Sequence, residues 1–181
     1  MPARARHLDW LLLALASILP VSTFGAACKG DETVSQQDPM LSEALALPVG
    51  IRVIHQPNPV SARTGGPSGR RYTWVYETRV EAIDRELRIV DFRAFNWVDG
   101  HWRFSNFTGK PFTSDNFASW YGCPGARLQP GKPVADSSNW SGSDELQATK
   151  GRWIYIGEDA RGNRYRGDAV VEKLAEVAPD K

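Results

Sequence analysis

The sequence contains few of the side chains that bind metals or act as nucleophiles. It has two cysteines, Cys28 and Cys123, and three histidines, of which only His55 and His101 follow the first 27 residues. These four residues lack the closely spaced ligand pairs of a zinc site. The Gly-x-Ser-x-Gly and Ser-x-x-Lys motifs of serine enzymes are also missing. We therefore expect no metal and no other cofactor, and we favour a protein that is not an enzyme.

An excess of charge of one sign is missing too. The chain has 22 basic and 21 acidic residues, which gives a formal net charge of +1. Proteins that bind nucleic acid or anionic membranes usually present a basic surface. We therefore expect no nucleic-acid partner. With 181 residues, 41% of them hydrophobic, the chain is long enough for one well-packed domain and too short for two.

The strongest hydrophobic run stands at the start of the chain and is too short to persist as a membrane-spanning helix. It covers residues 10–19, follows the basic residues Arg4 and Arg6, and precedes the small residues 25–27. This order is typical of a secretory signal peptide. The sequence therefore predicts a signal peptide over residues 1–27 and an exported protein, which is periplasmic, extracellular or attached to the envelope.

Export gives the two cysteines two alternative roles. Outside the cytoplasm Cys28 and Cys123 would pair, and a disulfide closing so long a loop stabilises a domain by about 2–5 kcal/mol. Alternatively, Gly25-Ala26-Ala27-Cys28 resembles a bacterial lipoprotein cleavage box, with Gly25 in place of the large aliphatic residue expected there. Cys28 would then carry a lipid, and only in that case do we expect a membrane anchor. Both interpretations stay open.

The rest of the chain divides into a polar part and a β-rich part. Residues 28–71 are rich in polar residues, proline and glycine, and we expect a tether followed by an extended segment. Residues 72–181 are predicted to form the folded domain. Its first strand is Tyr72–Ala82, in which every second residue shares one face. The buried face of this strand comprises Trp74, Tyr76, Thr78, Val80 and Ala82.

A β-hairpin is predicted around Asp99-Gly100. The preceding run Leu87–Val98 is rich in β-forming residues, and Asp-Gly accepts the two positive φ angles of a two-residue turn. Because Asp91 and Arg93 interrupt the apolar alternation, we expect a β-bulge in the first part of this run. The turn also sets the cross-strand register. The predicted pairs are Phe95 with Phe104, Asn96 with Arg103, Trp97 with Trp102, and Val98 with His101.

Downstream of the hairpin the pattern predicts a short helical turn, a polar loop, a strand and a final helix. Ser114 is the expected cap of the helical turn, and residues 136–145 are interpreted as a solvated loop, since their oxygen donors lack the spacing of a calcium-binding EF-hand. The strand is Arg152–Gly157, and the apolar stripe within Asp168–Val177 predicts the helix. The fold class is therefore mainly β: one antiparallel, sandwich-like domain with a short internal helical turn and a C-terminal helix.

The hairpin register places four large aromatic residues on one face, with Arg93 and Asn106 at its edge. Such a face is either a core or a platform that stacks on a sugar or a peptide. We favour a core, because an exposed patch of this size promotes aggregation. Trp120 and Trp140, outside the predicted strands, are then better placed to line a surface groove. The candidate ligand-binding residues are Trp97, Trp102, Arg93, Asn106, Trp120 and Trp140.

These features predict an exported, non-enzymatic binding or structural β module whose partner is an unidentified envelope protein or glycan. One alternative is an extracytoplasmic carbohydrate-binding module that uses Trp97 and Trp102. A second alternative is an envelope hydrolase with two paired carboxylates. Those carboxylates would be drawn from Asp84, Glu86, Asp91 and Asp144.

Overall fold

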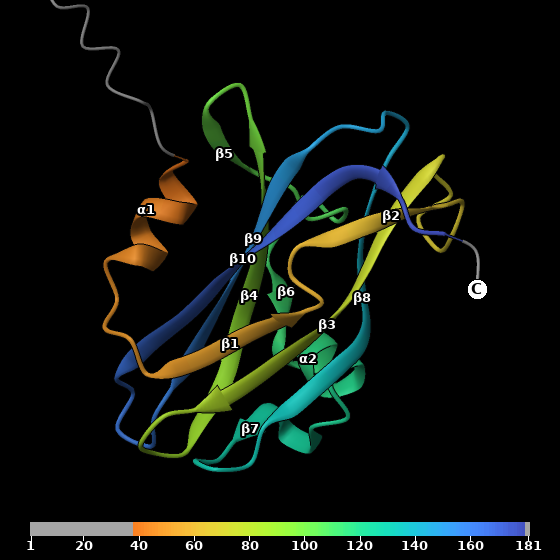
Figure 1. The fold of residues 1–181 in the computed structure, drawn as a ribbon. Coiled ribbons are helices and arrows are strands. Elements are labelled where there is room, and N and C mark those ends of the chain that lie inside the picture. The colour runs from red at the N-terminus through yellow and green to blue at the C-terminus, as the bar shows by residue number, and fades with distance from the viewer. Residues whose placement is uncertain (1–37, 180–181) are drawn as a thin grey trace, which may run out of the picture. The chain divides into compact units, whose positions relative to one another are not determined.

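The structure, a computed structural model, describes residues 38–179 (Figure 1). These residues form ten strands, two short α-helices and one 3-10 helix. In chain order the elements are α1 (Pro39–Leu45), β1 (Ile51–Gln56), β2 (Val60–Thr64), β3 (Tyr72–Ala82), β4 (Leu87–Val98), β5 (His101–Phe104), β6 (Phe112–Thr113), α2 (Ser114–Trp120), η1 (Pro124–Ala126), β7 (Arg127–Leu128), β8 (Val134–Ser143), β9 (Thr149–Glu158) and β10 (Arg164–Val177).

The strands join one mixed sheet. Its main path runs β1-β3-β2-β10-β9-β4-β5, with β6 and β7 paired to β4 and β8 paired to β3. The prediction of a mainly β domain is confirmed. The expected antiparallel arrangement is wrong at one pairing, because β2 and β10 run parallel and place Val60 opposite Lys173. This pairing connects the N-terminal strands of the sheet to its C-terminal strands.

The predicted alternation in β3 is confirmed. The strand has the predicted bounds, and the five residues assigned to its inner face are all buried. Trp74 is only 1% exposed, and its indole N–H donates to the carbonyl oxygen of Leu174 at 3.0 Å. The inner face of β3 therefore packs against the distant strand β10.

The predicted hairpin is also confirmed. In strands β4 and β5 the four predicted residue pairs lie opposite each other in the predicted register. The turn residues Asp99 and Gly100 have φ angles of 50° and 79°. The register between β4 and β9 shifts between Ile89 and Asp91, which confirms the bulge. A bulge changes which residues of a strand share a face. It explains why the apolar alternation of this run breaks near Asp91.

The predicted C-terminal helix is wrong, since Asp168–Val177 belongs to strand β10. This strand pairs with β9 continuously from Arg164 to Lys173. β-Branched residues such as Val171 fit a strand well, and the burial of alternate residues at Val171 and Lys173 has the period of a strand. Four apolar residues at helical spacing fit a strand equally well once a neighbouring strand is available for pairing.

The segment before Tyr72, predicted as a tether and an extended segment, contributes α1, β1 and β2 to the fold (Figure 1). Strand β1 pairs with β3 along its whole length. Helix α1 is capped by Asp38, whose carboxylate accepts from the backbone N–H of Met40 at 2.9 Å and of Phe104 at 3.1 Å. Asp38 therefore links α1 to the hairpin strand β5.

Strands β4 and β9 are covered on both faces. Successive residues of a strand point to opposite faces, so each strand contributes to two clusters. The larger core lies between these strands and β3 and includes Trp74, Tyr76, Phe92, Trp153, Tyr155 and Val171. The smaller core lies under α1 and comprises Leu41, Ala44, Phe95, Ile154 and Ile156.

Two predictions fall on residues that the structure does not describe: the signal peptide over residues 1–27 and both roles of Cys28. Within the described residues, Cys123 is buried, and its thiol donates to the carbonyl oxygen of Arg127 at 3.2 Å. No helix between residues 38 and 179 has the length and apolar character needed to cross a membrane.

Candidate functional site

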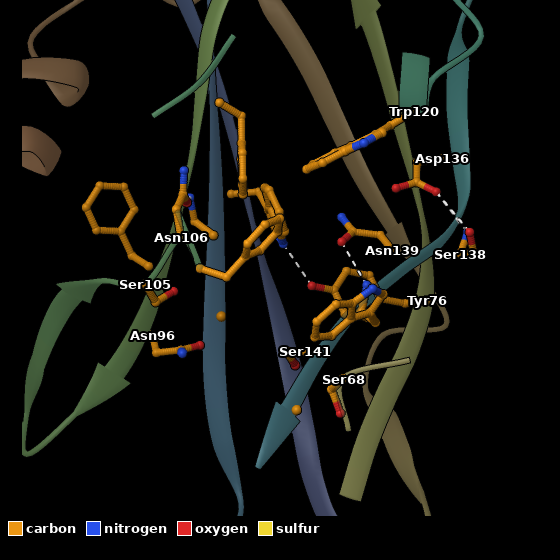
Figure 2. Close-up of a pocket in the computed structure, with 18 of the residues that line it drawn as sticks. Ser68, Tyr76, Asn96, Ser105, Asn106, Trp120, Asp136, Ser138, Asn139 and Ser141 are labelled. Carbon is orange, nitrogen blue, oxygen red and sulfur yellow. Dashed lines mark hydrogen bonds between the residues drawn. The ribbon is translucent and has the colours of Figure 1, made fainter. Parts of the chain in front are cut away.

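A pocket of about 630 Å³ lies where β3 and β8 face β4 and β9. Figure 2 shows Asn96, Ser105 and Asn106 on one side of this pocket and Asn139 and Ser141 on the other. Its aromatic lining comes from strands, from α2 and from the segment between β5 and β6. The aromatic residues of the lining include Tyr76, Phe107, Phe112, Trp120, Trp140 and Trp153.

Helix α2 positions Trp120 at the pocket. The helix is capped by Thr113, whose hydroxyl accepts from the backbone N–H of Asn116 at 3.3 Å, so the predicted helical turn is confirmed with a cap one residue earlier than expected. The Trp120 ring lies 4.8 Å from the Phe112 ring in a T-shaped contact. Phe107, which is 73% exposed, lies 6.4 Å from the same indole. These rings form a partly open aromatic wall.

Strand β8 forms the polar wall, at a place where the sequence predicts a loop. Its residues are polar on both faces and give no alternating signal, but pairing with β3 makes it a strand. The register shifts so that Tyr76 pairs with Asn139 and Thr78 pairs with Asp136. One extra residue of β8 is therefore accommodated as a bulge. The bulge brings the Asp136 and Asn139 side chains to the same pocket.

Two amides of the pocket are engaged within the protein. Asn106 accepts from the backbone N–H of Ala94 at 2.7 Å and donates to the carbonyl oxygen of Lys110 at 2.8 Å. Asn139 accepts from the backbone N–H of Trp140 at 2.8 Å and donates to the Thr78 hydroxyl at 2.9 Å. Hydrogen bonds of this kind fix side chains in one orientation. The two opposite walls of the pocket are thus rigid before any ligand binds.

Other polar groups of the pocket retain hydrogen-bonding capacity. Ser141 Oγ is buried and has no partner among the described residues. Asn96 accepts from Lys173 Nζ at 3.1 Å, while its amide nitrogen donates to no group within residues 38–179. A buried polar atom without a partner costs about 1–3 kcal/mol.

The pocket contains one carboxylate, that of Asp136, which accepts from the backbone N–H of Ser138 at 3.0 Å (Figure 2). Burial raises the pKa of Asp136, and the hydrogen bonds from Ser138 oppose this rise. Nearby, the Trp153 indole donates to the Tyr76 hydroxyl at 2.8 Å. Burial raises the pKa of Tyr76 above its ordinary value. The phenol therefore stays neutral and acts as a hydrogen-bonding group.

A buried polar chain supports Asn139 from behind. The Thr78 hydroxyl, which accepts from Asn139, lies 3.0 Å from His55 Nδ1, and His55 Nε2 lies 3.3 Å from the carbonyl oxygen of Ala169. Because a carbonyl only accepts, we assign the imidazole proton to Nε2 and the Thr78 hydroxyl proton to a bond with Nδ1. Burial lowers the pKa of His55 to about 4, with the Ala169 hydrogen bond opposing this shift. His55 is therefore neutral at pH 7.

Three of the six predicted ligand-binding residues, Asn106, Trp120 and Trp140, line the pocket. Asn106 has the structural role described above. Trp140 is half-buried and pairs with Val75 in the sheet. Successive residues of a strand point to opposite faces, so Trp140 and the inward-facing Asn139 point to opposite faces of β8. Trp120 is therefore the predicted residue whose ring is best placed for contact with a ligand.

The other three predicted residues, Trp97, Trp102 and Arg93, lie outside this pocket. Trp97 and Trp102 form a T-shaped pair with ring centroids 5.1 Å apart, and Trp102 borders a second, smaller hollow of about 320 Å³. Arg93 is only 6% exposed; it donates to Asp91 at 2.9 Å and to the carbonyl oxygen of Met40 at 3.0 Å. Arg93 therefore anchors α1 to β4.

The four carboxylates considered for a hydrolase each form an ion pair with a different arginine, and none of them lines the pocket. The pairs are Asp84 with Arg85 at 2.7 Å, Glu86 with Arg127 at 2.6 Å, Asp91 with Arg93 at 2.9 Å, and Asp144 with Arg70 at 2.6 Å. Within the described part of the chain, no three His, Cys, Asp or Glu residues group closely enough to hold a metal ion.

Comparison of the chain with protein-family models, with curated proteins and with solved structures gives no match. The function of the pocket therefore has to be inferred from its own residues. Those residues combine aromatic rings, hydroxyls and amides with two charged residues. Asp136 lies beside Trp120 in Figure 2, and the backbone N–H of Arg70 donates to the Ser68 hydroxyl at 3.1 Å.

Proposed function

We propose that the protein is a non-enzymatic binding module that holds a hydroxyl-bearing ring, such as a hexose unit, in the pocket. The main support is one observation: an aromatic wall at Trp120 and hydrogen-bonding groups at Asn96 and Ser141 line the same pocket. A sugar ring has an apolar C–H face, which packs on aromatic rings, and an edge of hydroxyls, which exchange hydrogen bonds with amides and hydroxyls.

The size of the pocket fits this ligand class. Small-molecule sites commonly have volumes of about 300–1,000 Å³. The volume of about 630 Å³ lies within this range and accommodates one or two sugar rings. The hydrogen-bonded Asn106 and Asn139 keep the walls in place, so little ordering is needed on binding.

We also propose that the two halves of the curled sheet act as a sandwich-like scaffold for the pocket. The support is that side chains from both halves meet, as in the bond from Trp153 on β9 to Tyr76 on β3. In such a scaffold the rings of the inner faces form the base of the pocket, and the strand edges and α2 form its rim.

The place of action is proposed from the sequence. The order of basic, apolar and small residues over 1–27 supports export to the periplasm, the cell surface or the envelope. There the module would meet free sugars or the glycans of the envelope.

Calorimetric titration with glucose, galactose, N-acetylglucosamine and their short oligomers tests the proposal. We expect millimolar or tighter binding of at least one sugar, and Trp120→Ala should weaken it by about tenfold or more, which corresponds to 1.4 kcal/mol. Trp97→Ala is the matched control, because it removes an indole outside the pocket. Loss of binding in Trp97→Ala alone would assign the site to the hairpin. No binding of any sugar would refute the proposal.

A further inference from the structure

We propose that the ligand of the pocket carries a carboxylate and that Lys173 is the residue that recognises it. This inference rests on the proposed function and narrows it to acidic sugars, of which the hexuronic acids are the simplest. The observation behind it is a buried lysine, next to the pocket wall, that has no acidic partner among residues 38–179.

Lys173 lies on the inner face of β10 and is only 5% exposed. Its Nζ donates to Asn96 Oδ1 at 3.1 Å and lies 5.9 Å from the centre of the Trp74 ring. An ammonium group can donate three hydrogen bonds, so the bond to Asn96 leaves donors unused. Because Asn96 lines the pocket, the ammonium group lies directly behind one of the pocket's own polar side chains.

Gly151 lies between the pocket and this amine and has no side chain of its own. It lies between Asn96 of β4 and Val171 of β10 in the sheet and is itself part of the pocket lining. A Cβ at this position would lie 3.9 Å from both Lys173 Nζ and Asn96 Oδ1, and 3.2 Å from a methyl carbon of Val171. Any larger residue at 151 would therefore crowd Val171 and stand between the pocket and the amine.

The charge of Lys173 is not balanced by its surroundings. The neighbouring Glu172 points to the other face of β10 and pairs with Lys150, and Asp144 pairs with Arg70 at the pocket edge. Asp136 lies at the other end of the pocket, beside Trp120 (Figure 2). Burial lowers the pKa of Lys173 to about 8, so most molecules carry the charge at pH 7. A buried charge without a partner is costly, and a ligand carboxylate would supply the missing counter-charge.

The test compares sugars that differ only in the acidic group: glucuronate against glucose, and galacturonate against galactose. Calorimetric titration of the parent protein at pH 7 should show tighter binding of the uronate by about tenfold or more. Lys173→Met keeps the length of the side chain and removes its charge. In this variant the ratio of the uronate affinity to the neutral-sugar affinity should fall to about one.

A second variant, which keeps Lys173, tests the inference even if Lys173→Met does not fold. Asn96→Asp keeps the size of the side chain and places a carboxylate beside Nζ, so it should also abolish the preference for the uronate. Equal binding of uronate and neutral sugar by the parent, or a preference that persists in both variants, would overturn this inference and leave the proposed function standing. Failure of the parent to bind these four sugars, N-acetylglucosamine and the short oligomers would overturn both.

Discussion

Two groups of aromatic rings lie on opposite faces of β4, and they differ in how they are covered. On the outer face Phe95 is completely buried beneath α1, and its ring centroid lies 5.7 Å from that of Phe104. On the inner face the Trp120 ring, with Phe107 beside it, remains partly open and shares a pocket with Asn96. The outer group stabilises the fold, and the inner group is available to a ligand.

The difference between the two groups lies in what surrounds the rings. The outer group is covered by apolar residues of α1, so its surface is removed from water. The inner group lies beside polar residues, and one of these, Ser141, has a buried hydroxyl without a partner in the described structure. Aromatic content alone therefore does not identify a binding surface. A partly open ring beside a polar group with unused hydrogen-bonding capacity does so better.

The largest expected effect comes from the outer group. Phe95→Ala removes a completely buried ring, and such a change usually costs about 3–5 kcal/mol because it leaves a cavity. Urea unfolding monitored by circular dichroism measures this loss. In the matched variant Trp120→Ala, which truncates a half-buried ring, we expect a smaller loss of stability and a loss of sugar binding. If Trp120→Ala proved the more destabilising of the two, the inner group of rings, and not the outer group, would be the one that stabilises the fold.

Lys173→Met should stabilise the unliganded protein. Burial lowers the pKa of this amine from 10.5 to about 8, so the unfolded chain holds the proton more tightly than the folded chain does. At pH 7 this difference costs the parent roughly 3 kcal/mol, and the cost shrinks as the pH rises from 8 towards 10.5. The stability of the parent should therefore approach that of the variant at high pH.

Urea unfolding of both proteins at several values between pH 7 and pH 10 tests this prediction. A variant less stable than the parent throughout this range would mean that Lys173 is well compensated in the folded state. Such a result would also contradict the inference that the pocket ligand carries a carboxylate.

The parts of the fold and of the pocket that could be predicted are those whose sequence pattern lies within a few neighbouring residues. The hairpin was predictable pair by pair, because Asp99-Gly100 fixes the register of its neighbours. Trp120 was predictable as a groove residue, because it lies in a helical turn outside the predicted strands. In both cases the signal lies within a few residues along the chain.

Signals that depend on distant pairing were missed. Strand β8 has polar residues on both faces, and only its pairing with β3 and the bulge bring Asp136 and Asn139 into the pocket. Strand β10 has an apolar spacing that fits a helix, and only pairing with β9 turns Lys173 inward. The residues that cover the outer aromatic group come from α1 (Pro39–Leu45), which lies far upstream of Phe95 in the chain.

A moderate effect is expected where α1 is fastened to the hairpin. Asp38→Ala removes the helix cap and the bond to the backbone N–H of Phe104, which should cost about 1–2 kcal/mol. Asp115→Ala, in the exposed first turn of α2, is a suitable control with a smaller expected loss. Thermal unfolding compares the two variants. Equal losses would mean that Asp38 contributes no more than an ordinary surface carboxylate.

The smallest effect is expected at the tip of the hairpin, where the outer group reaches solvent. Trp97 is 40% exposed, so Trp97→Phe should change the stability by no more than about 0.5 kcal/mol. Trp102 is better shielded, because the Arg152 guanidinium lies 4.9 Å above its ring. Iodide quenching of tryptophan fluorescence should therefore fall more in Trp97→Phe than in Trp102→Phe. The reverse order would show that the hairpin rings are open to solvent on the side assigned here to α1, and the outer group would then qualify as a second binding surface.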